Sequence, residues 1–138
     1  MAGYSGTPLA KKLGIKGGSR VFLSRPPKNY TALVAPLPDG VLMVAGISAT
    51  TDLVHLFVTS RKDLERALRT TMAKLRDDAP IWVSWPKKSS GVPTDITEDT
   101  IRAVALPMGL VDVKVCAVDE VWSGLKLVVR RENRKDTR

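Results

Sequence analysis

The sequence has little of the two residue types that most often carry covalent or metal chemistry, cysteine and histidine. Its 138 residues include one cysteine, Cys116, and one histidine, His55. A single cysteine cannot form a disulfide within the chain, which fits a reducing compartment. One histidine and one cysteine are too few for a zinc site made of nitrogen and sulfur ligands. We therefore expect no metal site, and we expect both residues to lie in strands without a catalytic role.

Long hydrophobic runs are absent as well. No stretch approaches the ~18 consecutive apolar residues that a membrane-spanning helix needs. Residues 1–6 lack the basic start and the apolar run of a secretory signal. We therefore expect a cytoplasmic protein that has no membrane partner.

The sequence does have enough apolar material for one core, and it has an excess of positive charge. Hydrophobic residues make up 43% of the chain, and the formal net charge is +8. Residues 1–30 hold six Lys or Arg and no acid, and residues 130–138 hold five against two acids. A duplex-binding protein usually shows a basic stripe along a folded element, whereas the C-terminal residues have the composition of a frayed tail. We expect one domain over residues 1–130, a basic disordered tail over 131–138, and no nucleic-acid partner.

Apolar runs bounded by glycine, proline and polar residues predict six strands, at about residues 20–24, 41–44, 53–58, 81–85, 111–118 and 125–130. Helices are predicted at about residues 7–14, 28–36, 61–76 and 97–106, with Thr7, Ser60 and Thr97 as N-caps. Apolar strands that alternate with helices indicate a three-layer, Rossmann-like α/β sandwich. We expect a mostly parallel sheet with an antiparallel C-terminal strand, because only the last two strands are joined by a short turn.

Three blocks of the chain carry a resemblance to a known family. They are residues 2–9 (AGYSGTPL), 85–95 (WPKKSSGVPTD) and 113–126 (VKVCAVDEVWSGLK). Together they resemble a bacterial family of short, uncharacterised proteins that is known as a domain of unknown function. The resemblance covers nearly the whole chain and implies no particular activity.

The second half of the chain also resembles the end of a class I methyltransferase, in a reduced form. In those enzymes a glycine-rich turn after the first strand approaches S-adenosylmethionine, and an acid at the end of the second strand holds the ribose hydroxyls. Here the first turn, residues 24–28 (SRPPK), contains no glycine, and the second strand ends at residues 44–47 (VAGI) without an acid. We therefore expect no bound cofactor, because a fold does not by itself bring the chemistry of its other members.

Polar and cationic side chains follow the predicted strands at their carboxyl ends, where open parallel sheets bind ligands. A long loop, residues 86–95, separates the fourth strand from the next helix, and loops on a rigid scaffold often carry binding residues. Helix N-termini at Ser60 and Thr97 should face the same edge and favour an anion. The candidate anion site comprises Arg25, Lys28, Arg61, Lys87, Lys88, Ser89, Ser90, Asp119, Glu120 and Trp122. The alternative is a structural clamp in which Asp119 or Glu120 pairs with Lys87 or Lys88.

Three classes of function remain open. The leading hypothesis is a small non-catalytic module that binds an anionic metabolite, a nucleotide or a protein partner at the carboxyl edge of the sheet. The second is a divergent enzyme of methyltransferase-like ancestry that uses the same edge, with Lys87 or Lys88 and Asp119 or Glu120 as proton-transfer or charge-stabilising groups. The third is a weak, non-specific nucleic-acid binder that uses the basic ends of the chain.

Overall fold

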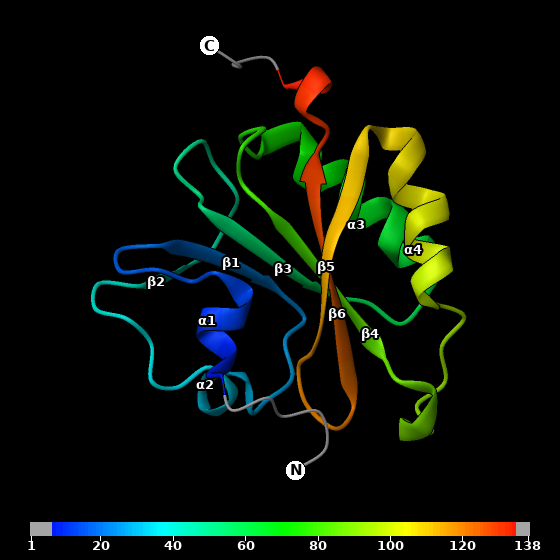
Figure 1. The fold of residues 1–138 in the computed structure, drawn as a ribbon, viewed down its shortest axis with the longest axis horizontal. Coiled ribbons are helices and arrows are strands. Elements are labelled where there is room, and N and C mark those ends of the chain that lie inside the picture. The colour runs from blue at the N-terminus through cyan, green and yellow to red at the C-terminus, as the bar shows by residue number, and fades with distance from the viewer. Residues whose placement is uncertain (1–6, 135–138) are drawn as a thin grey trace.

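Six strands form one mixed sheet in the order β2-β1-β3-β4-β6-β5, with helices on both of its faces (Figure 1). The computed structural model describes residues 7–134. The strands are β1 (Arg20–Ser24), β2 (Leu42–Val44), β3 (Leu53–Phe57), β4 (Ile81–Pro86), β5 (Leu110–Ala117) and β6 (Trp122–Val129). β1 is parallel to β2 and β3, and β3 is parallel to β4. β6 is antiparallel to β4 and β5, so the predicted Rossmann-like sandwich with an antiparallel C-terminal strand is confirmed.

The helices form the two outer layers. They are α1 (Leu9–Leu13), α2 (Tyr30–Leu33), α3 (Arg61–Lys74) and α4 (Glu98–Ala105), and single 3₁₀ turns cover Lys88–Ser90, Leu106–Met108 and Arg131–Asn133. α3 and α4 pack on one face of the sheet, and α1 and α2 pack on the other. No helix within residues 7–134 combines the length and the apolar composition needed to cross a membrane.

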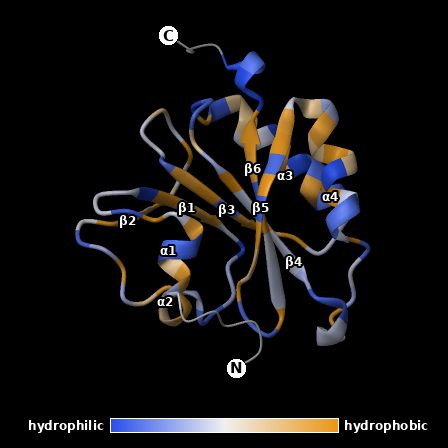
Figure 2. Ribbon diagram, in the orientation of Figure 1, coloured by the Kyte–Doolittle hydropathy of each residue, from blue (hydrophilic) through white to orange (hydrophobic). Residues whose placement is uncertain are grey.

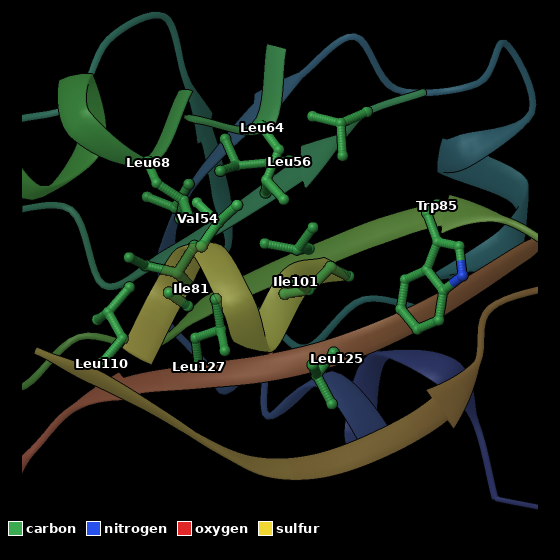
Figure 3. Packing of buried hydrophobic residues seen from close by; sticks show 14 of the residues in the cluster. Val54, Leu56, Leu64, Leu68, Ile81, Trp85, Ile101, Leu110, Leu125 and Leu127 are labelled. Carbon is green, nitrogen blue, oxygen red and sulfur yellow. The ribbon is translucent and has the colours of Figure 1, made fainter. Parts of the chain in front are cut away.

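The central strands are buried on both sides, as their continuous apolar sequences predict. In β3, Val54 and Leu56 point to the α3 layer, where Figure 3 shows them beside Leu64 and Leu68. Leu53 and Phe57, which alternate with them, belong to the second core cluster under α1 and α2. This alternation gives the sheet two cores, because successive side chains of a strand point to opposite faces. Figure 2 shows the resulting band of hydrophobic residues along β1 and β3.

The long helix α3 is amphipathic and capped within the chain. Leu64 and Leu68 are fully buried and lie four residues apart on one face. The side chain of Ser60 accepts a hydrogen bond from the backbone N–H of Asp63 at 3.2 Å, as predicted for the N-cap. At α4, Thr97 and Thr100 form a reciprocal capping box. Both helices therefore begin where the sequence predicts.

Three local predictions are wrong in detail. α1 has Pro8 as its N-cap residue, so Thr7 does not cap it. α2 covers only Tyr30–Leu33 of the predicted 28–36, because the residue before a proline, here Ala35, disfavours the helical conformation. β6 begins at Trp122 rather than at 125, because the carboxylate of Asp119 accepts the backbone N–H groups of Val121 and Trp122 and tightens the turn.

The start of the expected C-terminal tail is ordered against the sheet. Arg131–Asn133 form a 3₁₀ turn, and the side-chain amide of Asn133 donates to the carbonyl of Gly109 at 3.3 Å. The guanidinium of Arg134 donates to the carbonyl of Val129 at 3.0 Å. Residues 131–134 therefore differ from the expected disorder, and the remainder of the tail, residues 135–138, lies outside the described residues.

Candidate functional site

The hollow that best suits a small ligand lies beside α3, over the carboxyl ends of three parallel strands. The crossover from β2 to β3, residues 45–52, contains no helix, so within the described residues β1 and β2 have no helical cover on the α3 face. A hollow of about 390 Å³ results. It is lined by Phe22, Ser24, Arg25, Ala45, Gly46, Ile47, Leu56, Phe57, Val58, Asp63, Arg66, Ala67, Thr70, Thr71 and Lys74. Its position is the edge at which open parallel sheets bind their ligands.

The hollow has an apolar floor and a charged rim. Phe22 and Ile47 are partly buried and pack against the core below. Arg66 and Lys74 stand on the rim from α3, and Arg25 joins them from the end of β1. Asp63 is the single acidic residue of the lining. Three cations against one anion favour a ligand that combines an apolar body with a negative group.

Arg25 has an unusual backbone conformation at this edge. Its φ is +53°, in the left-handed region that residues other than glycine seldom adopt. The guanidinium Nη1 lies 3.2 Å from Oδ2 of Asp63, so Arg25 links the end of β1 to the first turn of α3. Pro26 and Pro27 follow directly. Strained, non-glycine positions of this kind cluster at ligand-binding edges.

The long loop after β4 is held by its backbone and by hydroxyl groups. The backbone N–H of Lys87 donates to the carbonyl of Val121 at 2.7 Å, and Pro86 lies opposite Trp122 in the sheet. The hydroxyl of Ser90 donates to the carbonyl of Lys87 at 2.6 Å. Within residues 7–134, no ion pair joins either lysine of this loop to the acids of the hairpin turn. The loop therefore lies against the turn through main-chain contacts rather than through the ion-paired clamp considered from the sequence.

The two helix N-termini near this edge already have partners inside the chain. The carboxylate of Asp95 accepts the backbone N–H of Arg61, the first residue of α3, at 2.8 Å. Thr94 donates its hydroxyl to the carbonyl of Thr59 at 2.6 Å, which fixes the loop against the end of β3. At α4 the capping box described above occupies the first turn. An anion at this edge would therefore depend on cationic side chains more than on the helix ends.

The structure divides the candidate residues of the sequence into separate groups. Arg25 lines the hollow, and Arg61 lies at the start of α3 with its side chain paired to Glu65 at 3.3 Å. Lys28 is exposed in the loop that leads to α2. The remaining seven gather at the shared end of β4 and β6: Lys87, Lys88, Ser89, Ser90, Asp119, Glu120 and Trp122.

Sequence reasoning missed the α3 side of the hollow. Arg66, Thr70 and Lys74 all line it, and they recur every four residues along the helix. Side chains at this spacing share one helix face. The sequence therefore contains a polar stripe beside the apolar stripe of this helix. That polar stripe forms a wall of the hollow only because no helix within residues 7–134 covers β1 and β2 on the α3 face.

The histidine belongs to a buried chain of hydrogen bonds on the other face of the sheet. Nδ1 of His55 lies 3.0 Å from the hydroxyl of Tyr30, and Nε2 lies 2.7 Å from the hydroxyl of Ser84. All three residues are buried, and Phe57 stacks on the imidazole at 4.3 Å between ring centroids. Burial lowers the pKa of His55 to about 3, and burial, followed by the charge of Cys116, raises the pKa of Tyr30. His55 is therefore neutral and internally bonded.

Cys116 is buried in β5, and burial raises the pKa of its thiol above the ordinary value. Among residues 7–134, no group of three or more histidine, cysteine or acidic side chains is arranged to hold a metal ion.

Comparison with known proteins places the chain in a family and a fold. Residues 35–131 match the model of a family described as "Protein of unknown function (DUF3052)". No curated protein matches the sequence. A likeness in fold extends to Aeropyrum pernix fibrillarin, solved with natively bound S-adenosyl-L-methionine, at 13% identity over 83% of this chain and 68% of that chain, with a TM-score of 0.56.

This chain covers a larger share of two further solved structures. One is an S-adenosylmethionine-dependent methyltransferase from Aquifex aeolicus, at 13% identity over 88% of each chain and a TM-score of 0.57. The other is a Sulfolobus solfataricus protein described as a type 11 methyltransferase, at 12% identity over 100% of this chain and 99% of that chain, with a TM-score of 0.61. At these identities the likeness shows a methyltransferase-like, Rossmann-type fold and leaves activity open.

Proposed function

Because the chain belongs to the DUF3052 family of proteins of unknown function and has a methyltransferase-like fold, we propose that it is a small binding module rather than a methyltransferase. Its ligand is an anionic metabolite or nucleotide that occupies the hollow beside α3. Its expected location is the cytoplasm, where such metabolites are abundant. The observation that carries the proposal is one concave surface with an apolar floor and a rim of three cations at the carboxyl edge of a parallel sheet.

The shape of the hollow supports a ligand with a flat apolar part. Its volume of about 390 Å³ lies within the usual range for small-molecule sites of about 300 to 1,000 Å³. The ring of Phe22 and the side chain of Ile47 offer an apolar surface to a base or an aromatic ring. The cations of the rim can then hold a phosphate or carboxylate, since Arg forms paired hydrogen bonds with both groups.

The residues at the same edge do not fit S-adenosylmethionine. The turn after β1 contains Arg25, Pro26 and Pro27 where the backbone of a methyltransferase approaches the cofactor through glycines. Arg25 also extends across this edge to Asp63. No acid follows β2 to hold ribose hydroxyls, and a cationic rim disfavours the positive sulfonium group.

Asp63 at the hollow and Asp119 in the hairpin turn are engaged in structural contacts, which supports a role in binding rather than catalysis. Asp63 is paired with Arg25, and Asp119 accepts two backbone N–H groups in the hairpin turn. A general base needs an oxygen that can accept a proton from a substrate. Neither carboxylate is presented in that way.

Isothermal titration with AMP, phenyl phosphate, inorganic phosphate and S-adenosylmethionine tests the proposal. We expect AMP or phenyl phosphate to bind more tightly than inorganic phosphate, because only the first two have a ring for the floor. Arg66→Ala should weaken binding about tenfold or more, since a hydrogen bond to a charged group contributes roughly 1.5 to 3 kcal/mol. Arg69→Ala is the matched control, because Arg69 is also exposed on α3 but does not line the hollow.

Two results would overturn the proposal. One is the absence of binding by AMP and phenyl phosphate at millimolar concentration with the folded protein. The other is an equal loss of affinity in the Arg66 and Arg69 variants, which would show that net charge rather than the hollow determines binding. Specific binding of S-adenosylmethionine followed by methyl transfer would favour the divergent enzyme instead.

A further inference from the structure

Arginines and lysines have different surroundings in this protein. Four arginines form all the ion pairs of residues 7–134: Arg25, Arg61, Arg76 and Arg102, with Asp52, Asp63, Glu65, Asp78, Glu98, Asp99 and Asp112 as their partners. No lysine of the described residues takes part in an ion pair with an acid. Among residues 7–134, ten lysines and six arginines therefore lie outside these ion pairs.

Five of these lysines lie around α1 and the β5–β6 hairpin, and we refer to them as the lysine surface. They are Lys11, Lys12, Lys16, Lys114 and Lys126. The ammonium group of Lys114 donates to the backbone carbonyl of Lys12 at 3.2 Å, although the two residues are 102 positions apart in the chain. Lys114 also lies directly opposite Lys126 in the sheet.

Two shallow hollows shape this surface, one on each side of α1. The first, of about 580 Å³, is lined by Thr7, Lys11, Lys12, Lys114, Val115, Cys116 and Ala117. The second, of about 440 Å³, is bordered by Lys16 and Lys126 and by the backbone around Gly17 and Gly18. The indole N–H of Trp82 donates to the carbonyl of Leu13 at 2.9 Å and fixes α1 between them. The lysines are thus positioned by the core rather than carried on a free tail.

The acid nearest to the second hollow does not neutralise the surface. Asp52 lies on its lining, but its carboxylate is paired with Arg76 at 3.2 Å and accepts the backbone N–H of Arg20 at 2.9 Å. Like charges directly opposite in a sheet are destabilising, so the Lys114–Lys126 pair opposes folding. A lysine on an edge strand can protect it from aggregation. That explanation applies to Lys114, because β5 is an edge strand. It does not apply to Lys126, because β6 lies inside the sheet.

We propose that the lysine surface binds the phosphate backbone of a nucleic acid without reading its sequence. Several separate cations spread over two hollows fit a polymer of regularly spaced anions, and such contacts supply non-specific affinity. Neither hollow has an aromatic side chain in its lining, so neither offers a platform on which bases could stack. A membrane is a poorer fit, because the apolar residues of α1, Leu9, Ala10 and Leu13, are buried in the core.

Fluorescence anisotropy with a labelled 20-base-pair DNA duplex and a 20-nucleotide single-stranded RNA tests the proposal at 50, 100 and 200 mM NaCl. We expect binding that weakens with salt, with a log-log slope of roughly −4.5 for the duplex if about five lysines contact phosphates. The double variant Lys114→Gln with Lys126→Gln should lower the affinity and flatten the slope by about 2, one unit for each lost contact. Scrambling the sequence of either probe should leave its affinity unchanged.

The matched control is Lys87→Gln with Lys88→Gln, which removes the same charge from the loop after β4, where neither lysine lines either hollow. If both double variants lose the same affinity, net charge alone explains the binding and the proposal fails. It also fails if neither probe binds at 50 mM NaCl, or if polyglutamate or vesicles with anionic lipid bind as well as the nucleic acids do. Should the first double variant unfold, Lys11→Gln with Lys12→Gln carries the same expectation. The hollow beside α3 lies on the opposite face of the sheet from the lysine surface. These lysine variants should therefore leave AMP binding unchanged, whether or not nucleic acid binds.

Discussion

Nε2 of His55 lies 2.7 Å from the hydroxyl of Ser84, and both residues are fully buried. Tyr30 completes the chain on the other ring nitrogen at 3.0 Å. A protonated imidazole would place a charge in the core beneath α1 and α2, next to the ring of Phe57. The protein therefore folds around a neutral histidine, and its stability depends on pH through this residue.

We expect the free energy of unfolding to fall as the pH is lowered from about 6.5 towards 3. The pKa of His55 is about 3 in the folded protein and 6.5 in the unfolded chain. The unfolded state binds the extra proton within this window, so the stabilisation present above pH 6.5 is lost on acidification. The full shift corresponds to a loss on the order of 5 kcal/mol. Urea denaturation at pH 7, 6, 5 and 4 follows the loss, of which roughly 3 kcal/mol should be present at pH 4.

The control for this prediction is His55→Gln, which keeps a polar side chain but does not titrate. Its unfolding free energy should be lower at pH 7, because buried hydrogen bonds are lost, and it should depend less on pH between 6.5 and 4. An identical pH dependence in the two proteins would show that carboxylates, and not His55, cause the acid destabilisation.

Arg25→Gly should leave the unfolding free energy within about 1 kcal/mol of the original protein. Glycine adopts the φ of +53° without strain, and the exposed ion pair with Asp63 contributes at most about 1 kcal/mol. Arg25→Val should instead lower the unfolding free energy by roughly 1 to 3 kcal/mol, because a β-branched residue is strained at positive φ. Thermal melting that ranks valine at or above glycine would contradict the left-handed conformation at this position.

Asp95→Ala should destabilise the protein by about 1 kcal/mol, the usual cost of losing a side chain that caps a helix. Asp95 accepts the N–H of Arg61 and so joins the loop after β4 to α3. Hydrogen exchange at the Arg61 amide should become faster in this variant. Glu120→Ala is the control, because Glu120 is an exposed acid of the hairpin turn whose loss should change neither quantity. Unchanged exchange at Arg61 would argue against the cap.

Removal of residues 132–138 should leave the fold intact at a small cost. The truncation deletes the contact of Asn133 with the carbonyl of Gly109 and that of Arg134 with the carbonyl of Val129. Each hydrogen bond is worth about 1 kcal/mol, and the segment contains no large apolar side chain. Circular dichroism should therefore be unchanged and the melting temperature should fall by a few degrees. Loss of the cooperative transition would show that the segment is part of the core structure.

The sequence predicts the architecture well because its signals are local. Apolar strands such as β3 and β4 differ clearly from the four-residue spacing of α3, and Ser60 and Thr97 mark where helices begin. Parallel pairing follows from helices that join successive strands. The errors fall where a proline shortens a helix, as at α2, and where Asp119 tightens a turn. The proline is visible in the sequence, whereas the turn depends on hydrogen bonds of Asp119 that composition does not reveal.

The candidate surfaces could be predicted only in part. The carboxyl edge of the sheet follows from strand direction, and Arg25, which lines the hollow there, was placed at that edge in the same way. Asp95 was not expected at the N-terminus of α3, because a loop residue caps that helix from 34 positions away. The wall formed by Arg66 and Lys74 was missed as well, since a polar helix stripe becomes the side of a hollow only when the neighbouring strands lack cover.

Sequence alone determined the class of fold, the position of the single histidine in a strand and the excess of positive charge, because each depends on residue type and short-range spacing. The tertiary structure decided where that charge is concentrated. It places Lys12 against Lys114 and sets Lys114 opposite Lys126. Lys114 faces Lys126 because β5 pairs with β6 in the terminal hairpin. Lys12 reaches Lys114 because α1 docks on Trp82 beside that hairpin. Such long-range proximity arises from packing of the core, and no local pattern in the chain encodes it.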